Sequence, residues 1–118
     1  MNNMDAVTAN QIISALLSMR MKSSGNLWEQ RISIVTTWML IRHGLYADTL
    51  RISDKLLAHP HDLIHKAVGW MLREIGKQDI DILEDYLETH YLQMHRTTLR
   101  YAIEKMDEPH RIYWLRRR

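Results

Sequence analysis

The stretch that decides the fold of this chain is Lys66-Ala67-Val68-Gly69-Trp70-Met71-Leu72-Arg73-Glu74-Ile75-Gly76-Lys77. At about 100° per residue, its side chains fall on two opposed faces of one helix. The first face is an apolar stripe with the spacing of a core-facing helix, made of Ile64, Ala67, Val68, Met71, Leu72 and Ile75. The opposite face, which we call the cationic stripe, carries Lys66, Trp70, Arg73 and Lys77.

The cationic stripe places a tryptophan among three cations, turned away from the core side of its own helix. This combination favours a polyanion that also offers apolar sugar surface, and nucleic acid is such a ligand. The alternative is that Trp70 packs against a neighbouring helix, because Trp is highly buried on average. This stretch alone leaves both interpretations open.

The composition is that of an ordinary globular domain. The chain has 118 residues, of which 46% are hydrophobic and 25% charged, and its net charge is +2. It contains no Cys, which excludes disulfides and cysteine-ligated metals. The N-terminus lacks the features of a signal peptide, and no apolar run is long enough to span a bilayer. We therefore expect a cytoplasmic protein that does not associate with membranes.

Helical periodicity extends along the chain, and no segment alternates with the period of a strand. Gly44 stands where a glycine ends a helix, and Gly76 is expected to end the central one. Trp28 and Trp38 lie on a helix that is apolar on most sides, so we expect both in the core, and Arg31 on that helix needs a partner or an opening to solvent. The expected helices span residues 5–21, 26–43, 48–58, 62–76, 80–91 and 97–105, with a short final helix around 112–115.

Two segments of the chain repeat. Trp38-Met39-Leu40 precedes Gly44 with the same spacing as Trp70-Met71-Leu72 precedes Gly76. Helical hairpins that recur every ~31–32 residues are typical of a short α-solenoid, in which each hairpin buries its apolar face by stacking on the next. The predicted fold is therefore all-α, with antiparallel helix pairs and a concave side that usually binds the ligand.

Three motifs resemble the DNA alkylation repair family, the AlkD-like DNA glycosylases. They are Asn26-Leu27-Trp28-Glu29-Gln30-Arg31, the stretch His65 to Lys77, and Thr98-Leu99-Arg100-Tyr101-Ala102-Ile103-Glu104. The resemblance covers nearly all of this chain and about the second half of that family's fold. It implies a short right-handed solenoid of HEAT-like helix pairs, with residues 1–118 forming one domain that is truncated relative to the family.

The resemblance also implies a function. Members of the family bind duplex DNA in a cationic channel and hydrolyse the glycosidic bond of N3- and N7-alkylated purines in base excision repair, without a metal or an organic cofactor. The expected partner is alkylated double-stranded DNA, and self-association or a completing N-terminal half is a further expectation. The residues expected to contact DNA are Arg31, Lys66, Trp70, Arg73, Lys77, Arg96 and Arg100.

Four positions correspond to the family's active site. Trp70 matches its second tryptophan and Arg31 its arginine. In the same alignment Met4 stands at the position of the first tryptophan and Thr8 at that of the catalytic aspartate. Threonine carries no negative charge for an oxocarbenium-like sugar, so the resemblance implies a DNA-binding domain with impaired catalysis.

Two other interpretations remain. One is a non-catalytic helical-repeat scaffold whose concave face binds DNA or an acidic protein partner. The other concerns His61-Asp62-Leu63-Ile64-His65, which places two imidazoles four residues apart, as in some zinc-binding helices. A zinc site needs at least a third ligand, and the sequence pattern places none, so we expect surface histidines and no metal.

Overall fold

The computed structural model describes residues 27–117, and within that range every regular element is an α-helix. The prediction of an all-α fold is thereby confirmed for these residues. The expected helix over 5–21, with Met4 and Thr8, lies outside the described residues. The helices are α2 (Leu27–Thr36), α3 (Trp38–Arg42), α4 (Ala47–Leu56), α5 (Asp62–Gln78), α6 (Ile80–His90), α7 (Arg96–Ala102) and α8 (Glu108–Arg116).

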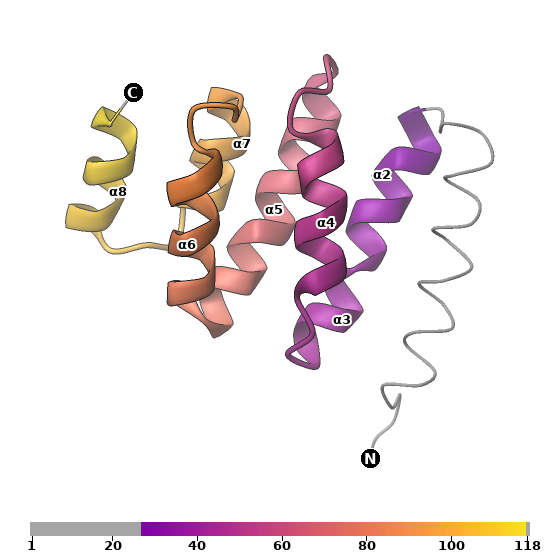
Figure 1. Ribbon diagram of the computed structural model, residues 1–118, viewed down its shortest axis with the longest axis horizontal. Coiled ribbons are helices and arrows are strands. Elements are labelled where there is room, and N and C mark those ends of the chain that lie inside the picture. Colours follow the sequence, from indigo (N-terminus) through magenta and orange to yellow (C-terminus); the bar gives the residue numbers. More distant parts are fainter. Residues whose placement is uncertain (1–26, 118) are drawn as a thin grey trace.

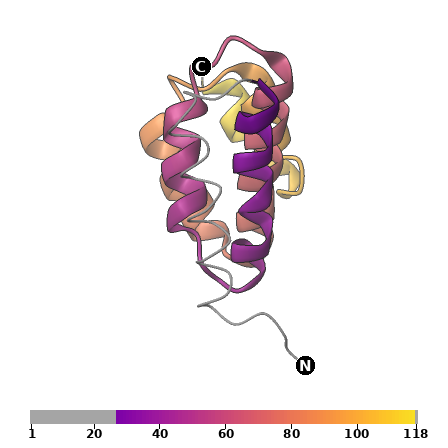
Figure 2. The same cartoon turned by 90° about the vertical axis from the view of Figure 1, so that its right-hand side faces the viewer.

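Helix α5 is the centre of this arrangement. It packs against α2, α4, α6 and, most extensively, α7. Figure 1 shows α4 and α6 in front of α5 and α7, and the turned view in Figure 2 separates α4 from α2. The described helices thus form two layers, with α2, α5 and α7 in one and α4 and α6 in the other.

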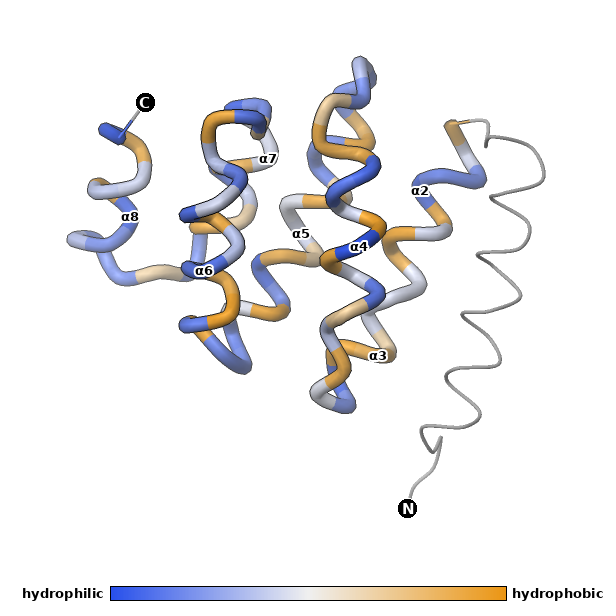
Figure 3. Tube along the Cα trace, viewed as in Figure 1, coloured by the Kyte–Doolittle hydropathy of each residue, from blue (hydrophilic) through white to orange (hydrophobic). Residues whose placement is uncertain are grey.

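The predicted apolar stripe of α5 is confirmed as the core face. Its six residues are each at most 2% exposed. Hydrophobic and hydrophilic residues alternate along α4 and α6, as expected for helices with one buried side (Figure 3). The core cluster also includes buried residues from the other helices, among them Ile34, Ile52, Leu83, Leu87, Leu99 and Trp114.

Polar side chains fix both ends of α5 and the start of α6. His61, rather than the neighbouring aspartate, caps α5, since its Nδ1 accepts from the backbone N–H of Leu63 at 3.1 Å. Asp79 ends α5 and begins α6: its N–H donates to the Ile75 carbonyl at 2.8 Å, and its carboxylate accepts from the Ile82 N–H at 3.4 Å. Helix α5 therefore continues past Gly76, where the sequence analysis expected it to end.

The helix expected over 26–43 is divided at Thr37. The hydroxyl of Thr36 donates to the Ile32 carbonyl and that of Thr37 to the Ile34 carbonyl, both at 2.6 Å. Such bonds compete with the helical ladder for the same carbonyls, which accounts for the division between α2 and α3. After α3, Gly44 adopts a φ of 76°, as predicted for a glycine that ends a helix.

The two tryptophans expected in the core are not there. Trp28 is 66% and Trp38 is 37% exposed. Helix α2 buries only Ser33 and Ile34, so its apolar residues are spread over several faces and only one face meets the core. That expectation was wrong because a helix without a distinct polar face does not indicate which of its apolar residues are buried.

Several polar contacts join residues separated by the predicted repeat period. The Tyr46 hydroxyl donates to Gln78, 32 residues away, at 2.9 Å, and the Tyr86 hydroxyl donates to Asp54, also 32 residues away, at 2.8 Å. Arg73 pairs with Glu104 at a separation of 31 residues. These separations equal the period of 31–32 residues inferred from the sequence.

Candidate nucleic-acid interface

The cationic stripe lies on the part of α5 that the core does not cover. Lys66 and Lys77 are exposed, while Trp70 and Arg73 are half-buried. Trp70 also packs against the edge of the core cluster. Part of the Trp70 side chain therefore contacts the protein, as the packing interpretation expects, and the remaining part faces solvent.

Carboxylates already pair with the cations of the stripe. Lys66 Nζ lies 3.6 Å from Asp62 Oδ2, and Lys77 Nζ lies 3.3 Å from Glu74 Oε2. Both lysines are about half exposed, so these pairs are weak and a phosphate group can replace the carboxylate at little cost. Arg73 is more firmly held, because its side chain is only 19% exposed and pairs with Glu104.

Arg31 on α2 is half-buried, and its Nε has no hydrogen-bond partner among the described residues. A buried guanidinium nitrogen without an acceptor is costly, since it has lost water and gained no partner. The sequence analysis singled out this charge for the same reason.

The two arginines predicted on α7 differ in the structure. Arg96 donates from Nη1 to the Leu115 carbonyl at 3.1 Å and so ties α7 to the end of α8. Arg100 is exposed, and it forms no ion pair or hydrogen bond with any residue of the described range. Of the two, Arg100 is the better placed for a phosphate.

A glycine brings α7 close to α5. A Cβ atom built on Gly69 would lie 2.7 Å from the Thr98 carbonyl oxygen and 2.5 Å from Tyr101 Cβ. Only a residue without a side chain permits this approach. The close packing sets Arg100 on α7 beside the helix that carries the stripe.

One surface feature was missed by the sequence analysis. The Arg42 guanidinium lies 5.0 Å from the centre of the exposed Trp38 ring, a cation–π distance. The spacing of four residues within one helix was the available signal. It was overlooked because Trp38 had been assigned to the core.

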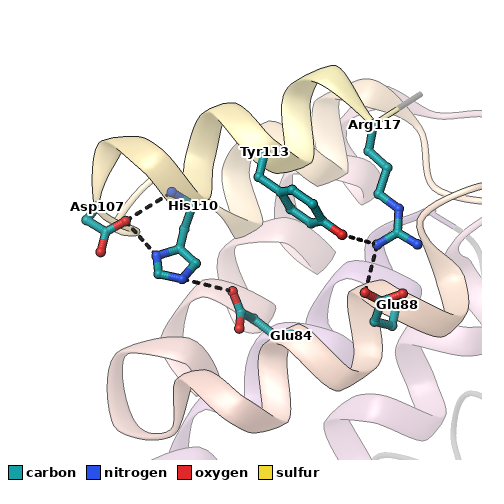
Figure 4. A network of polar contacts seen from close by, with 6 residues as sticks. All are labelled: Glu84, Glu88, Asp107, His110, Tyr113 and Arg117. Carbon is teal, nitrogen blue, oxygen red and sulfur yellow. Dashed lines mark hydrogen bonds and ion pairs between the residues drawn. The ribbon is translucent and has the colours of Figure 1, made fainter.

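A network of polar contacts, which we call the polar network, joins α8 to α6 (Figure 4). His110 lies 2.6 Å from Asp107 and 4.0 Å from Glu84, while Arg117 lies 2.7 Å from both Glu88 and the Tyr113 hydroxyl. Its hydrogen bond with Asp107 raises the pKa of His110, and hydrogen bonds from His110 lower the pKa of Asp107. The network holds α8 in place, and none of the predicted DNA contacts belongs to it.

Among residues 27–117, one group could hold a metal ion. The ligand atoms of Asp62, His65 and His95 all lie within 4.8 Å of one another. The group lies where α5 and α7 begin, and Asp62 also pairs with Lys66 of the cationic stripe.

The sequence that forms these helices matches a known family. The model of the DNA alkylation repair enzyme family matches residues 7–106. The chain belongs to the DNA alkylation repair enzyme family. The resemblance stated from the sequence is thereby confirmed, and no curated protein or solved structure matches the chain significantly.

For this DNA alkylation repair family member, the matched range contains the cationic stripe, Arg31 and Arg100. It also includes Thr8 and begins after Met4. It stops at Met106, so α8 lies beyond it. No helix between residues 27 and 117 has the length and hydrophobicity to cross a bilayer.

Proposed function

We propose that this chain is a DNA-binding domain of the DNA alkylation repair type, acting on duplex DNA that carries alkylated purines. The observation that carries the proposal is the family match over residues 7–106. The exposed Arg100 supports it, because its guanidinium is a cation available to phosphate. The half-buried Arg31 adds a second cation, with one guanidinium nitrogen that has no partner among the described residues. The proposed contacts are Arg31, Lys66, Trp70, Arg73, Lys77 and Arg100, with Arg96 in a supporting position.

The proposed architecture is a short right-handed HEAT-like solenoid. Polar contacts between residues 31 or 32 positions apart support it, since stacked repeats bring equivalent positions together. In such a stack α2, α5 and α7 form one layer. DNA would then lie along the exposed side of this layer, which bears the cationic stripe.

Catalysis is proposed to be weak. An alkylated purine is cationic and leaves readily, so a glycosylase mainly stabilises the positively charged sugar with a carboxylate and aromatic faces. Thr8 stands where the family has its aspartate, and Met4 where it has a tryptophan. Loss of one such electrostatic contact costs on the order of 10²–10³ in rate.

The direct test is single-turnover release of 7-methylguanine from methylated duplex DNA, with protein in excess. We expect release close to the spontaneous rate for the parent chain. The double variant Thr8→Asp with Met4→Trp is expected to release the base faster by at least ten-fold. Efficient release by the parent chain would show that the aspartate position is misassigned or bypassed, and would make the chain a working glycosylase.

DNA binding is tested separately through its salt dependence. The logarithm of the association constant should fall linearly with the logarithm of salt concentration, and Lys66→Ala should reduce that slope by about 1. Arg31→Ala should weaken binding in the same way. Arg51→Ala is the matched control, because Arg51 is an exposed arginine on α4, in the other layer, paired with Asp48.

Binding that does not depend on salt, or that Arg51→Ala weakens as much as Arg31→Ala, would contradict the proposed surface. In that case the alternative of a scaffold for a protein partner would gain support.

A further inference from the structure

Four histidines gather where α5 and α7 begin. His59 and His61 precede α5, His65 lies in its first turns, and His95 caps α7. His61 and His59 already accept hydrogen bonds from backbone amides. His61 Nδ1 accepts from the Leu63 N–H, and His59 Nδ1 accepts from the His61 N–H at 3.0 Å. The other two, His65 and His95, stack ring on ring with centroids 4.2 Å apart.

The tautomer of His65 follows from its hydrogen bond. Its Nε2 lies 2.5 Å from the His59 carbonyl oxygen. A carbonyl oxygen only accepts, so Nε2 must carry the proton, and in the neutral ring Nδ1 keeps its lone pair. This Nδ1 is buried without a hydrogen-bond partner, in a residue that is 4% exposed. His65 therefore presents a fixed, unsatisfied lone pair.

A carboxylate lies close to this nitrogen. His65 Nδ1 lies 4.0 Å from Asp62 Oδ1, which is too far for a hydrogen bond. Two acceptors at this separation leave room for a cation between them. Zinc bonds to imidazole nitrogen and to carboxylate oxygen are each about 2.0–2.2 Å long, so one ion can bridge this gap.

His95 is the third donor, and it has to turn. An ion bound to an imidazole nitrogen lies in the plane of the ring, whereas the planes of His65 and His95 are inclined by only 16° and stacked. His95 is exposed, and its Nδ1 accepts one hydrogen bond, from the Thr97 N–H at 3.2 Å. Rotation of this side chain would exchange the stacking and the cap for a bond to the ion.

We propose that Asp62, His65 and His95 bind a divalent transition-metal ion of the Zn²⁺ class. Two imidazoles and one carboxylate suit zinc, with a water molecule as the fourth ligand. The carbonyl of His59 acts as the positioning group, since ligating histidines usually donate their second ring N–H to such an acceptor. The ion would clamp the start of α5 to the start of α7.

Two features of the surroundings bear on this site. An open cleft of about 410 Å³ has two of the three proposed ligands, His65 and His95, in its wall. Lys66 Nζ lies 3.6 Å from the other oxygen of Asp62 and competes for the carboxylate. The sequence pattern does not show His95 as a third ligand, because His95 is 30 positions from His65 in the sequence and adjacent to it only in the fold.

The test is a titration of the full chain with Zn²⁺, followed by calorimetry and by ¹H–¹⁵N correlation spectra of the histidine rings. We expect one equivalent to bind, with Nδ1 of His65 and one ring nitrogen of His95 shifting. Asp62→Asn and His95→Gln should each weaken binding by at least about ten-fold. Cobalt(II) in place of zinc should give the visible absorption of a tetrahedral site.

A control variant separates this site from chance histidine binding. His43→Gln removes an exposed histidine at the end of α3 and should leave the affinity unchanged. Failure of Zn²⁺ to bind, or binding that survives both Asp62→Asn and His95→Gln, would overturn the proposal. Both of these variants are at exposed positions, so the test holds even if a change at buried His65 unfolds the chain.

Discussion

The two Trp-Met-Leu segments have the same sequence spacing and occupy different environments. In α3, the segment beginning at Trp38 ends after five residues, and Gly44 turns the chain with a φ of 76°. In α5, the segment beginning at Trp70 lies in the middle of a 17-residue helix, and Gly76 stays helical against Leu83. Both copies of the motif are helical, and the residues around each copy determine how long its helix is.

The residue before each tryptophan accounts for much of this difference. Thr37 precedes Trp38, and its hydroxyl bonds back to the Ile34 carbonyl, so the helix is divided there. Gly69 precedes Trp70 and lets α7 pack directly on the backbone of α5. The first segment therefore lies at a break in the helix, and the second lies where α5 packs most extensively on another helix.

Gly69→Ala should have the largest effect. The new methyl group would meet the Thr98 carbonyl oxygen and Tyr101 Cβ, so α5 and α7 would have to separate. We expect a loss of about 2–3 kcal/mol in the free energy of unfolding, measured by urea denaturation at constant m-value. A loss below about 0.5 kcal/mol would mean that the two helices can move apart freely, and the contrast between the segments would lose its basis.

The next largest effect is the difference in stability loss between Trp70→Ala and Trp38→Ala. Trp70 packs against the core, and its truncation should cost about 2 kcal/mol, less than for a fully buried ring. Trp38 is 37% exposed and contacts Arg42, so its truncation should cost about 1 kcal/mol or less. Thermal unfolding followed by circular dichroism measures both without depending on tryptophan fluorescence. Equal losses would show that the two rings are equally buried in solution.

Asparagine in place of the two glycines should separate their roles. Gly44→Asn should cost at most about 0.5 kcal/mol, because asparagine adopts positive φ more readily than other side chains and nothing lies within 4 Å of the site. Gly76→Asn should cost about 1–2 kcal/mol, since its Cβ would overlap Leu83 Cδ2 and lie 3.3 Å from Leu83 Cβ. Urea midpoints of the two variants compare them directly, and a reversed order would contradict the assigned backbone conformations.

The smallest effect concerns α8, which has no Trp-Met-Leu segment and which the polar network joins to α6. The hydrogen bond with Asp107 raises the pKa of His110 above its ordinary 6.5, so the stabilisation is complete below that pH and is lost as pH rises through the higher value. The pKa of Asp107 is lowered from its ordinary 3.8. The stabilisation from its carboxylate is therefore present above that pH and is lost in stronger acid. Attachment of α8 should therefore be strongest between pH 3.8 and 6.5.

The measurement is the near-ultraviolet dichroism of buried Trp114 across this range, compared with the variant His110→Gln. The parent signal should weaken above neutral pH, and the variant should show no such change. The same profile in both proteins would remove His110 as the cause.

Strong periodicity made most of the fold predictable. The apolar stripe of α5 has a single interpretation, and its residues are buried as expected. Helix α2 has no such stripe, which is why Trp28 and Trp38 were wrongly placed in the core. The end of α5 was misjudged because glycine serves both for a left-handed turn, as at Gly44, and for close packing, as at Gly76. Only the neighbouring Leu83 distinguishes the two.

Long-range pairs were beyond prediction for the same kind of reason. The cations of the stripe were found from spacing alone, but the pairing of Arg73 with Glu104 and the engagement of Arg96 with Leu115 depend on which helices meet. The grouping of His95 with His65 is a further example. Sequence spacing orders the side chains on one helix, and only the packing of helices shows what each one faces.

The spacing of the polar contacts also bears on how the chain folds. Tyr46 with Gln78, Asp54 with Tyr86 and Glu88 with Arg117 all join residues between 29 and 32 positions apart. No loop much longer than one helix pair has to close before these contacts form, so the entropic barrier is low and rapid folding is expected. Unfolding can likewise begin at one end, and amide hydrogens of α8 should exchange with solvent before those of α5.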